Sequence, residues 1–137
     1  MRKLNVTIVY NKEEDKILMC YRSKDPYRGL YNLVGGKVEE HEDDTQAAYR
    51  ELEEETGITV EDIILTHLMN FSYPISDVEL QVYAGKLNKE IEVIDEINKL
   101  YWFAANDDFF AMDKFAGEGN IGHMIEQVKL HREECLK

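Results

Sequence analysis

The chain has 137 residues, with 16 Lys and Arg against 28 Asp and Glu, which gives a formal net charge of −12. This length predicts a single domain over residues 1–137. The acidic charge is spread along the whole chain and argues against binding of long nucleic acid, whose affinity depends on neutralising phosphates with Lys and Arg. A small polyanion is not excluded, because a bound metal ion can carry the positive charge.

The sequence also bears on the compartment and the partners. After a charged start, the first apolar stretch covers about five residues, too few for a secretory signal or a membrane span. We therefore expect a cytoplasmic protein with no membrane partner. Cys20 and Cys135 lie far apart and neither has a CxxC-like partner, which favours two reduced thiols over a disulfide or a metal site. Monomer and homodimer both fit the sequence.

Strand and turn patterns alternate in the N-terminal part of the chain. Apolar, β-branched segments predict strands at residues 4–10, 16–22 and 30–34. The segment NKEED at 11–15 predicts a hairpin turn, and the Pro- and Gly-containing segment 23–29 predicts a loop. The pair Gly35-Gly36 predicts a turn of the chain after the third strand.

The pattern becomes helical after residue 43. Asp43 and Gln46 fit a capping box, and Gly57 stands where a left-handed C-terminal residue belongs. A helix over about 44–56 is therefore expected. Further strands are predicted at residues 63–71, 78–87 and 97–103, and a last helix at about 120–135. This order predicts an α/β fold in which helices cover both faces of a mixed sheet.

Three acids of the central helix share one face. Glu51, Glu54 and Glu55 stand at i, i+3 and i+4, so their carboxylates project together. This spacing suits a shared hard cation such as Mg²⁺ or Mn²⁺, which prefers oxygen ligands. Gly36, which has no Cβ, lets its backbone carbonyl approach the same ion. Taken alone, the triplet is a weak signal, because most runs of charged residues are solvated helix faces.

The stretch GGKVEEHEDDTQAAYRELEEETGI, from Gly35 to Ile58, contains a longer pattern. It reads Gly36, five residues, Glu42, seven residues, Arg50-Glu51-Leu52, one residue, Glu54-Glu55, one residue, Gly57-Ile58. This pattern resembles the Nudix box of nucleoside diphosphate-linked moiety hydrolases. The order of predicted elements is also similar to the Nudix α/β/α sandwich. His41 stands where many relatives have Gly, which we interpret as a loop variant.

The resemblance implies a Mg²⁺-dependent pyrophosphohydrolase, with Mn²⁺ as an alternative ion. In the family, the positions matching Glu51, Glu54, Glu55 and the carbonyl of Gly36 hold divalent ions, and a water attacks phosphorus. The carboxylate that removes the proton of the water is Glu54 or Glu96, and the box does not choose between them.

Arg50 is predicted to turn away from the carboxylate face and to clamp Glu42 or order its neighbours. It completes the predicted catalytic set together with the acids of the box.

Residues outside the box must select the substrate. The segment GLYNLVGGKVE resembles the MutT and 8-oxo-dGTP diphosphatase branch. By that resemblance Asn32 binds the edge of a purine, with Tyr31 in or behind the pocket. In the loop before the last helix, Phe115 is a candidate to stack on the base and Glu118 to bind ring N–H groups.

Arg22 and Lys37 belong to the one notably basic neighbourhood and are the candidates for contact with the substrate phosphates.

The leading hypothesis is hydrolysis of a nucleoside triphosphate, such as the oxidised purine nucleotide 8-oxo-dGTP, to a monophosphate and pyrophosphate. Pro74, beyond the box, resembles a feature of ADP-ribose-cleaving relatives, and Tyr73 one of dinucleoside polyphosphate hydrolases. Both residues also fit the turn expected between two strands. ADP-ribose, a dinucleoside polyphosphate, or a non-catalytic nucleotide-binding module are the alternatives.

Overall fold

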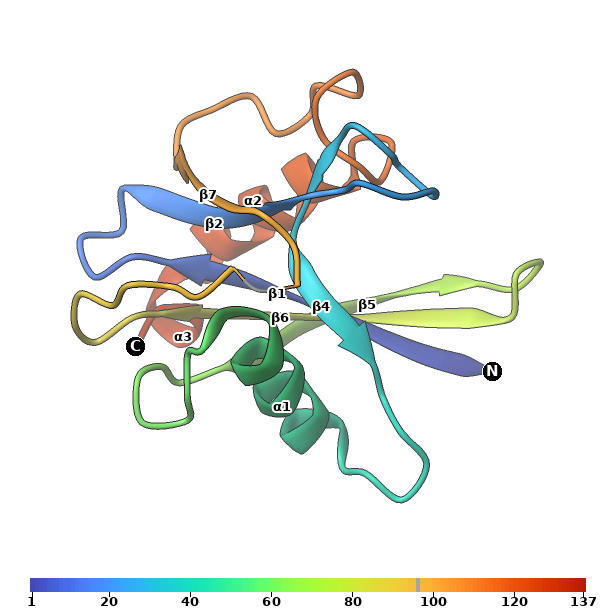
Figure 1. Cartoon of the computed structure of the whole chain (residues 1–137), viewed down its shortest axis with the longest axis horizontal. Helices are drawn as coiled ribbons and strands as arrows, with labels where there is room; N and C mark the ends of the chain where they lie inside the picture. Colours follow the sequence, from blue (N-terminus) through green and yellow to red (C-terminus); the bar gives the residue numbers. More distant parts are fainter. Residues whose placement is uncertain (96) are drawn as a thin grey trace.

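A mixed β-sheet forms the centre of the structure, a computed structural model that describes residues 1–95 and 97–137 (Figure 1). The strands are β1 (Arg2–Tyr10), β2 (Lys16–Tyr21), β3 (Tyr31–Asn32), β4 (Val34–Lys37), β5 (Thr66–Tyr73), β6 (Val78–Lys86) and β7 (Leu100–Ala104). The helices are α1 (Asp44–Thr56), α2 (Asn120–Leu130) and α3 (Arg132–Cys135).

The strand order is β3-β2-β1-β6-β5, with β4 also paired to β1 and β7 to β2. β1 and β6 run parallel over their whole length, and the other strand pairs are antiparallel. β1 lies at the centre of this order and β6 beside it, and β4 pairs with the middle of β1, from Leu4 to Thr7.

Two apolar layers lie on opposite faces of this sheet. On one face, Ala48 and Leu52 of α1 pack with Val9 and Tyr83 of the central strands. On the other face, residues of α2 and α3 pack with the alternate residues of the same strands. The predicted α/β/α sandwich with a mixed sheet is confirmed.

The central helix has the predicted bounds and caps. The side chain of Asp43 accepts a hydrogen bond from the backbone N–H of Gln46 at 3.3 Å, and Gly57 is left-handed with φ 80°. The predicted C-terminal helix is instead two helices, because α2 ends at Leu130 and α3 begins at Arg132. Among the described residues, no helix is long and apolar enough to cross a membrane.

The prediction of a turn at Gly35-Gly36 is wrong, since both residues belong to β4 and pair with Val6 and Asn5 of β1. A Cβ on Gly35 would collide with the backbone of Asn5 and Val6, so the missing side chain permits a close crossing of two strands. In Figure 1, β4 crosses β1 steeply beside α1.

The two cysteines are free and buried. Cys20 packs in the layer under α1 and Cys135 in the layer under α2, so the sheet separates them. Burial raises the pKa of the Cys20 thiol to about 11, which keeps it protonated at neutral pH.

Candidate active site

The acids predicted to bind metal lie on α1 with different degrees of exposure. The side chain of Glu51 is 14% exposed, whereas that of Glu54 is 54% exposed, and Glu55 is half-buried. Their spacing on the helix is the predicted one, but α1 packs against the sheet so that Glu51 and Glu55 lie closer to the protein interior than Glu54.

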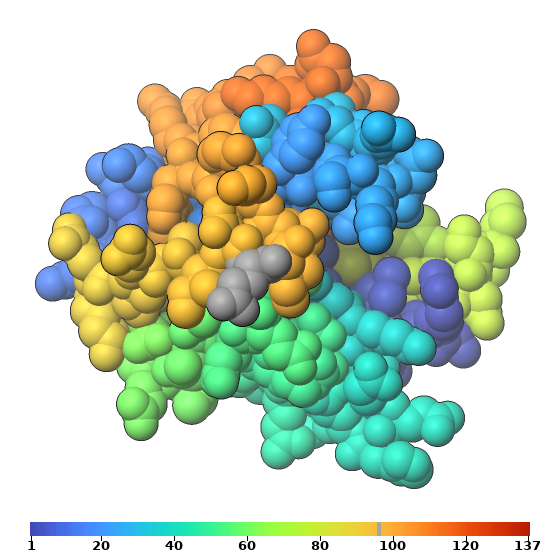
Figure 2. Space-filling model, viewed as in Figure 1, coloured from blue at the N-terminus to red at the C-terminus, as the bar shows by residue number. Residues whose placement is uncertain are grey.

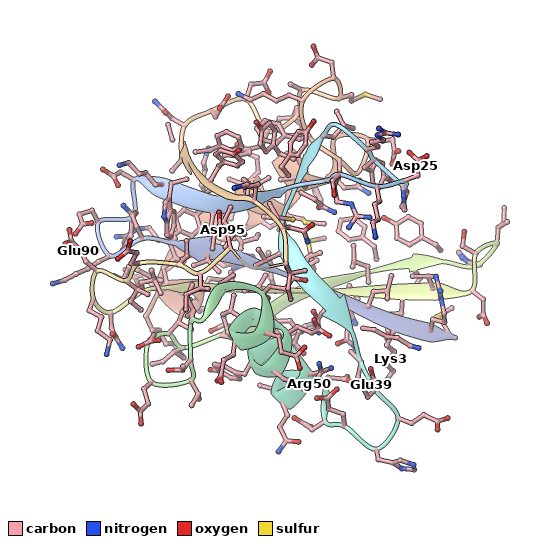
Figure 3. All side chains as sticks on the ribbon, in the orientation of Figure 1. Lys3, Asp25, Glu39, Arg50, Glu90 and Asp95 are labelled. Atoms are coloured by element: carbon pink, nitrogen blue, oxygen red, sulfur yellow. The ribbon has the colours of Figure 1, made fainter. Side chains whose placement is uncertain are left out.

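Arg50 is the counter-charge of this face. Its guanidinium donates to both carboxylate oxygens of Glu42, to Glu51 Oε1 at 3.0 Å and to Glu54 Oε2 at 3.1 Å. A further N–H donates to the backbone carbonyl of Lys37 at 3.0 Å. Figure 3 shows the Arg50 side chain directed toward the loop that carries Glu39.

The predicted clamp on Glu42 is therefore present. The prediction that Arg50 turns away from the carboxylate face is wrong, because the long side chain reaches the acids one and four positions after it on the helix, Glu51 and Glu54. The hydrogen bonds from Arg50 hold the pKa of Glu42 below its ordinary value.

Gly36 lies directly against the Glu51 carboxylate. A Cβ on Gly36 would come within 2.6 Å of Glu51 Oε1 and closer still to the rest of the carboxylate. Only glycine therefore leaves room for Glu51 in this position. The backbone N–H of Gly36 donates to Asn5 Oδ1 at 3.0 Å, which fixes this part of β4 to β1.

Glu55 lies beside Glu51 in a poorly solvated place. Burial, and then the negative charge of Glu51, raise the pKa of Glu55 to about 7, while the amide of Gly35 and the charge of Arg22 act in the opposite direction. Two carboxylates that repel each other at half-buried positions would be stabilised in their charged forms by a bound cation.

The acids of this face and Gly36 are the residues available to hold a divalent cation. Within residues 1–95 and 97–137, no three Asp, Glu, His or Cys side chains converge closely enough to hold an ion as they stand. Arg50 is the physical reason, since it already holds Glu51 and Glu54. The oxygen donors, the mutual repulsion of Glu51 and Glu55 and the Cβ-free approach of Gly36 nevertheless fit Mg²⁺ or Mn²⁺. The shared metal site stays a prediction.

A cavity of about 660 Å³ opens beside these acids. Its volume is in the range of sites for small ligands. Among the residues that line it, the charged ones are Arg2, Arg22, Lys37 and Glu55. Figure 2 shows the surface hollowed between the blue loop of residues 22–28 and the N-terminal strand. In a chain of net charge −12, three cations against one carboxylate reverse the local charge.

The cavity brings together some of the predicted binding residues. Arg22, Lys37 and Asn32 line it, as predicted for phosphate and base contacts. Asn32 Oδ1 accepts a hydrogen bond from the N–H of Leu33 at 2.8 Å, so its Nδ2 group is the part available to a ligand acceptor. The phosphate and base roles of these three residues stay predictions.

One predicted base-binding residue is buried in the core, and a second does not line the cavity. Phe115 is 1% exposed and packs against Phe103 and Phe109 in the core, so the prediction that it stacks on a base is wrong. Tyr31 packs edge-on against Tyr21, Tyr101 and Phe103 and does not line the cavity. Glu96, the second candidate base, lies outside the described residues.

Glu118 accepts a hydrogen bond from the Tyr27 hydroxyl at 2.9 Å instead of standing free to read a base.

Three lining residues were not predicted to bind the substrate. Tyr27 and Tyr73 both line the cavity, and Asn120 Nδ2 donates to the Tyr73 hydroxyl at 3.0 Å. The hydrogen bond between Tyr27 and Glu118 joins residues 91 positions apart, and the one between Tyr73 and Asn120 joins residues 47 positions apart. No local sequence pattern indicates contacts of this range. Pro74 lies in the turn between β5 and β6, as the turn interpretation predicted.

Comparison with known proteins decides the family. The model of the NUDIX domain matches residues 1–119. The chain belongs to the NUDIX family. Members of this family are pyrophosphohydrolases that hydrolyse phosphoric anhydride bonds, and the predicted family is confirmed.

The curated relatives of this chain are named for different substrates. This Nudix chain is 33% identical over 103 residues to the NAD-capped RNA hydrolase NPY1 of Saccharomyces cerevisiae, which covers 70% of this chain and 27% of that protein. It is 30% identical over 82 residues to the 8-oxo-dGTP diphosphatase of Escherichia coli, covering 58% of this chain and 64% of that protein. The chain thus spans less than two thirds of the length of these curated relatives.

A solved structure supports the fold. The Ap4A hydrolase of C. elegans, in a binary complex, superposes with a TM-score of 0.77 at 20% identity and covers 97% of this chain and 98% of that chain. At this identity the likeness shows the Nudix fold alone.

Proposed function

We propose that this Nudix protein is a Mg²⁺-dependent pyrophosphohydrolase that cleaves a nucleoside triphosphate to a nucleoside monophosphate and pyrophosphate. The observation that carries the proposal is the local charge reversal: Arg2, Arg22 and Lys37 line the cavity beside the box acids of a strongly acidic chain. A small polyanion is the ligand class that such a place attracts.

Arg22 and Lys37 are the proposed phosphate contacts. Arg22 ends up beside Glu55 and donates through Nε to the carbonyl of Pro26 at 3.2 Å, which fixes the guanidinium while leaving other N–H groups to donate. Lys37 is exposed at the end of β4, one residue after Gly36. Both cations are therefore near the acids without neutralising all of them.

The chemistry divides between the bound metal and the side chains of the box. Mg²⁺ held by Glu51, Glu54, Glu55 and the Gly36 carbonyl would supply Lewis-acid polarisation of the phosphates. The protein residues hold the polyphosphate in line with an attacking water, and a carboxylate takes the proton of that water. Glu54 is the proposed acceptor, because it is the most exposed of the three acids. Glu96 is the alternative.

An oxidised purine nucleotide such as 8-oxo-dGTP is the leading substrate. The free Nδ2 of Asn32 suits the acceptor edge of a guanine-like base, and the rings of Tyr27 and Tyr73 offer aromatic surface in the same cavity. The similarity to the 8-oxo-dGTP diphosphatase of Escherichia coli points in the same direction.

The presence of Tyr73 in the cavity favours a dinucleoside polyphosphate as the second candidate substrate. ADP-ribose and a non-catalytic nucleotide-binding role are the remaining alternatives.

A substrate panel tests the proposal. The protein is incubated with the common dNTPs, 8-oxo-dGTP, ADP-ribose and dinucleoside polyphosphates in Mg²⁺, and the products are separated by ion exchange. We expect release of a monophosphate and pyrophosphate from triphosphates, fastest for the oxidised purine. Hydrolysis of ADP-ribose without triphosphate turnover would overturn the proposed substrate class. Nucleotide binding without hydrolysis under any divalent ion would overturn the proposed enzymatic activity.

A further inference from the structure

Two buried amide side chains lie under α1 next to Gly36, and neither has all its hydrogen bonds. Asn5 is 2% exposed and Gln81 is 3% exposed. Among the described residues, Asn5 Nδ2 and Gln81 Oε1 have no hydrogen-bond partner. One of these atoms is a donor and the other is an acceptor, so they are complementary.

The sheet places the two side chains next to each other. Asn5 of β1 is the register partner of Gln81 of β6 in a parallel pair, so both side chains point to the same face. That face is the one under α1, since Val9 and Tyr83, an even number of residues further along the two strands, pack in the α1 layer. The free donor and the free acceptor therefore share one buried place.

Asn5 connects this place to the candidate metal site. Its Oδ1 accepts the N–H of Gly36, and Gly36 lies against the Glu51 carboxylate. The orientation of the Asn5 amide decides whether an oxygen or a nitrogen faces Gly36. A group that accepts from Nδ2 would fix the productive orientation, and Gln81 Oε1 is the acceptor at hand.

We propose that Asn5 and Gln81 form a buried amide relay that positions Gly36 against Glu51, with one buried water joining Asn5 Nδ2 to Gln81 Oε1. A water is the bridging group that fits, because Asn5 and Gln81 are register partners in the parallel pair, yet their two free atoms make no hydrogen bond to each other. Both residues are proposed as positioning residues that act through Gly36: Asn5 lines the cavity beside Gly36, whereas Gln81 does not line it.

Only one part of this proposal, the effect of the relay on metal binding, rests on the proposed function. Outer-shell groups that orient ligands change metal affinity by about 10- to 100-fold when they are removed. The hold on the Gly36 amide is a property of the protein without metal, so the two parts of the proposal are measured separately.

The test uses Gln81→Met, Asn5→Leu and the double variant, with Asn70→Ala as the control, because Asn70 is an exposed amide opposite Gln81 on β5. Hydrogen exchange of the Gly36 amide is followed by NMR in the metal-free protein, and Mn²⁺ affinity is measured by calorimetry. We expect each single variant to speed exchange of Gly36 and to weaken Mn²⁺ binding about tenfold. Asn70→Ala should change neither.

The double variant tests whether the two residues act as one unit. Since Asn5→Leu already breaks the relay, adding Gln81→Met should weaken Mn²⁺ binding no further, and it should recover unfolding stability because no lone polar group is left buried. Effects on affinity that multiply would overturn the relay. If Asn5→Leu does not fold, Gln81→Met decides alone, because its deleted atoms do not touch Gly36.

The remaining outcomes are also distinct. Unchanged Gly36 exchange in Gln81→Met overturns the relay. Faster exchange with unchanged Mn²⁺ affinity overturns its role at the metal site. If the unmodified protein binds no Mn²⁺, the proposed metal site fails, while the exchange result still confirms or overturns the relay.

Discussion

Gly36→Ala tests whether the candidate metal site depends on the close contact between Gly36 and the Glu51 carboxylate. The added methyl group would come within 2.6 Å of Glu51 Oε1, well inside van der Waals contact. The obstacle is the end of a flexible side chain, so Glu51 can swing aside without moving the backbone. We expect the variant to fold and the carboxylate to leave its place.

The size of the effect follows from what Glu51 gives up. Its carboxylate loses the hydrogen bond from Arg50, which is 3.0 Å long and joins side chains that are 14% and 31% exposed. A charged hydrogen bond in this setting, discounted for partial solvent access, contributes about 1–2 kcal/mol to the free energy of unfolding. A displaced ligand should also weaken Mn²⁺ binding by about tenfold or more.

Gly35→Ala is the matched comparison on the neighbouring residue. Its methyl group would meet backbone atoms, with Asn5 C and Val6 Cα both at 2.8 Å. Because backbone cannot swing aside, the crossing of β4 over β1 must open, and we expect a loss of about 3 kcal/mol or more in the free energy of unfolding.

Urea unfolding and Mn²⁺ calorimetry on both variants provide the readouts. The expected pattern is a stable Gly36→Ala protein with weakened metal binding, and a poorly stable Gly35→Ala protein. Parent-like Mn²⁺ affinity in Gly36→Ala would refute the reasoning, since it would show that the contact between Gly36 and Glu51 is not part of the metal site.

Three further predictions concern groups around the site and at the far end of the sheet. Arg50→Lys should lower the free energy of unfolding by about 1–3 kcal/mol in urea denaturation, because an ammonium cannot make the five hydrogen bonds of the guanidinium. Glu14→Gln should cost about 1 kcal/mol at pH 7. Hydrogen bonds from Lys86 and then Arg132 lower the pKa of Glu14, so this contribution is present above its ordinary pKa and disappears as the pH falls through the lowered one; a difference that grew in acid would contradict it. Tyr27→Leu should raise KM for a purine triphosphate about tenfold with kcat unchanged, and Tyr27→Phe much less, if the ring stacks on the base; the same rise in the control Tyr101→Leu would contradict a stacking role.

Signals that are local in the sequence predicted α1 well. Asp43 and Gly57 are the caps of the helix, and the residues between them set its length. The resemblance of the whole stretch from Gly36 to Ile58 to the Nudix box indicated the family before any tertiary contact was known, whereas the spacing of the acids alone did not.

Gly35 and Gly36 show where local signals failed. A pair of glycines indicates a turn or a close approach, and the sequence alone does not distinguish them. Here the deciding fact is tertiary, because β4 crosses β1 at a distance that excludes a Cβ.

The same limit explains the base-binding residues. Phe115 is an aromatic residue in a predicted loop, yet it is buried against Phe103 and Phe109, and its sequence position does not show whether the loop turns it inward or outward. The aromatic surface of the cavity comes instead from Tyr27 and Tyr73, whose partners lie far along the chain. Contacts of this range are set by the fold.

The measurement that tests the central claim most directly is the initial rate of pyrophosphate release from 8-oxo-dGTP and dGTP, with and without Mg²⁺, for the parent protein and Glu54→Gln. We predict release only with a divalent ion, and a rate lowered by at least about 100-fold in the variant, whose unfolding midpoint should stay within error of the parent. Parent-like turnover by Glu54→Gln, or release by the parent protein without any divalent ion, would contradict the account.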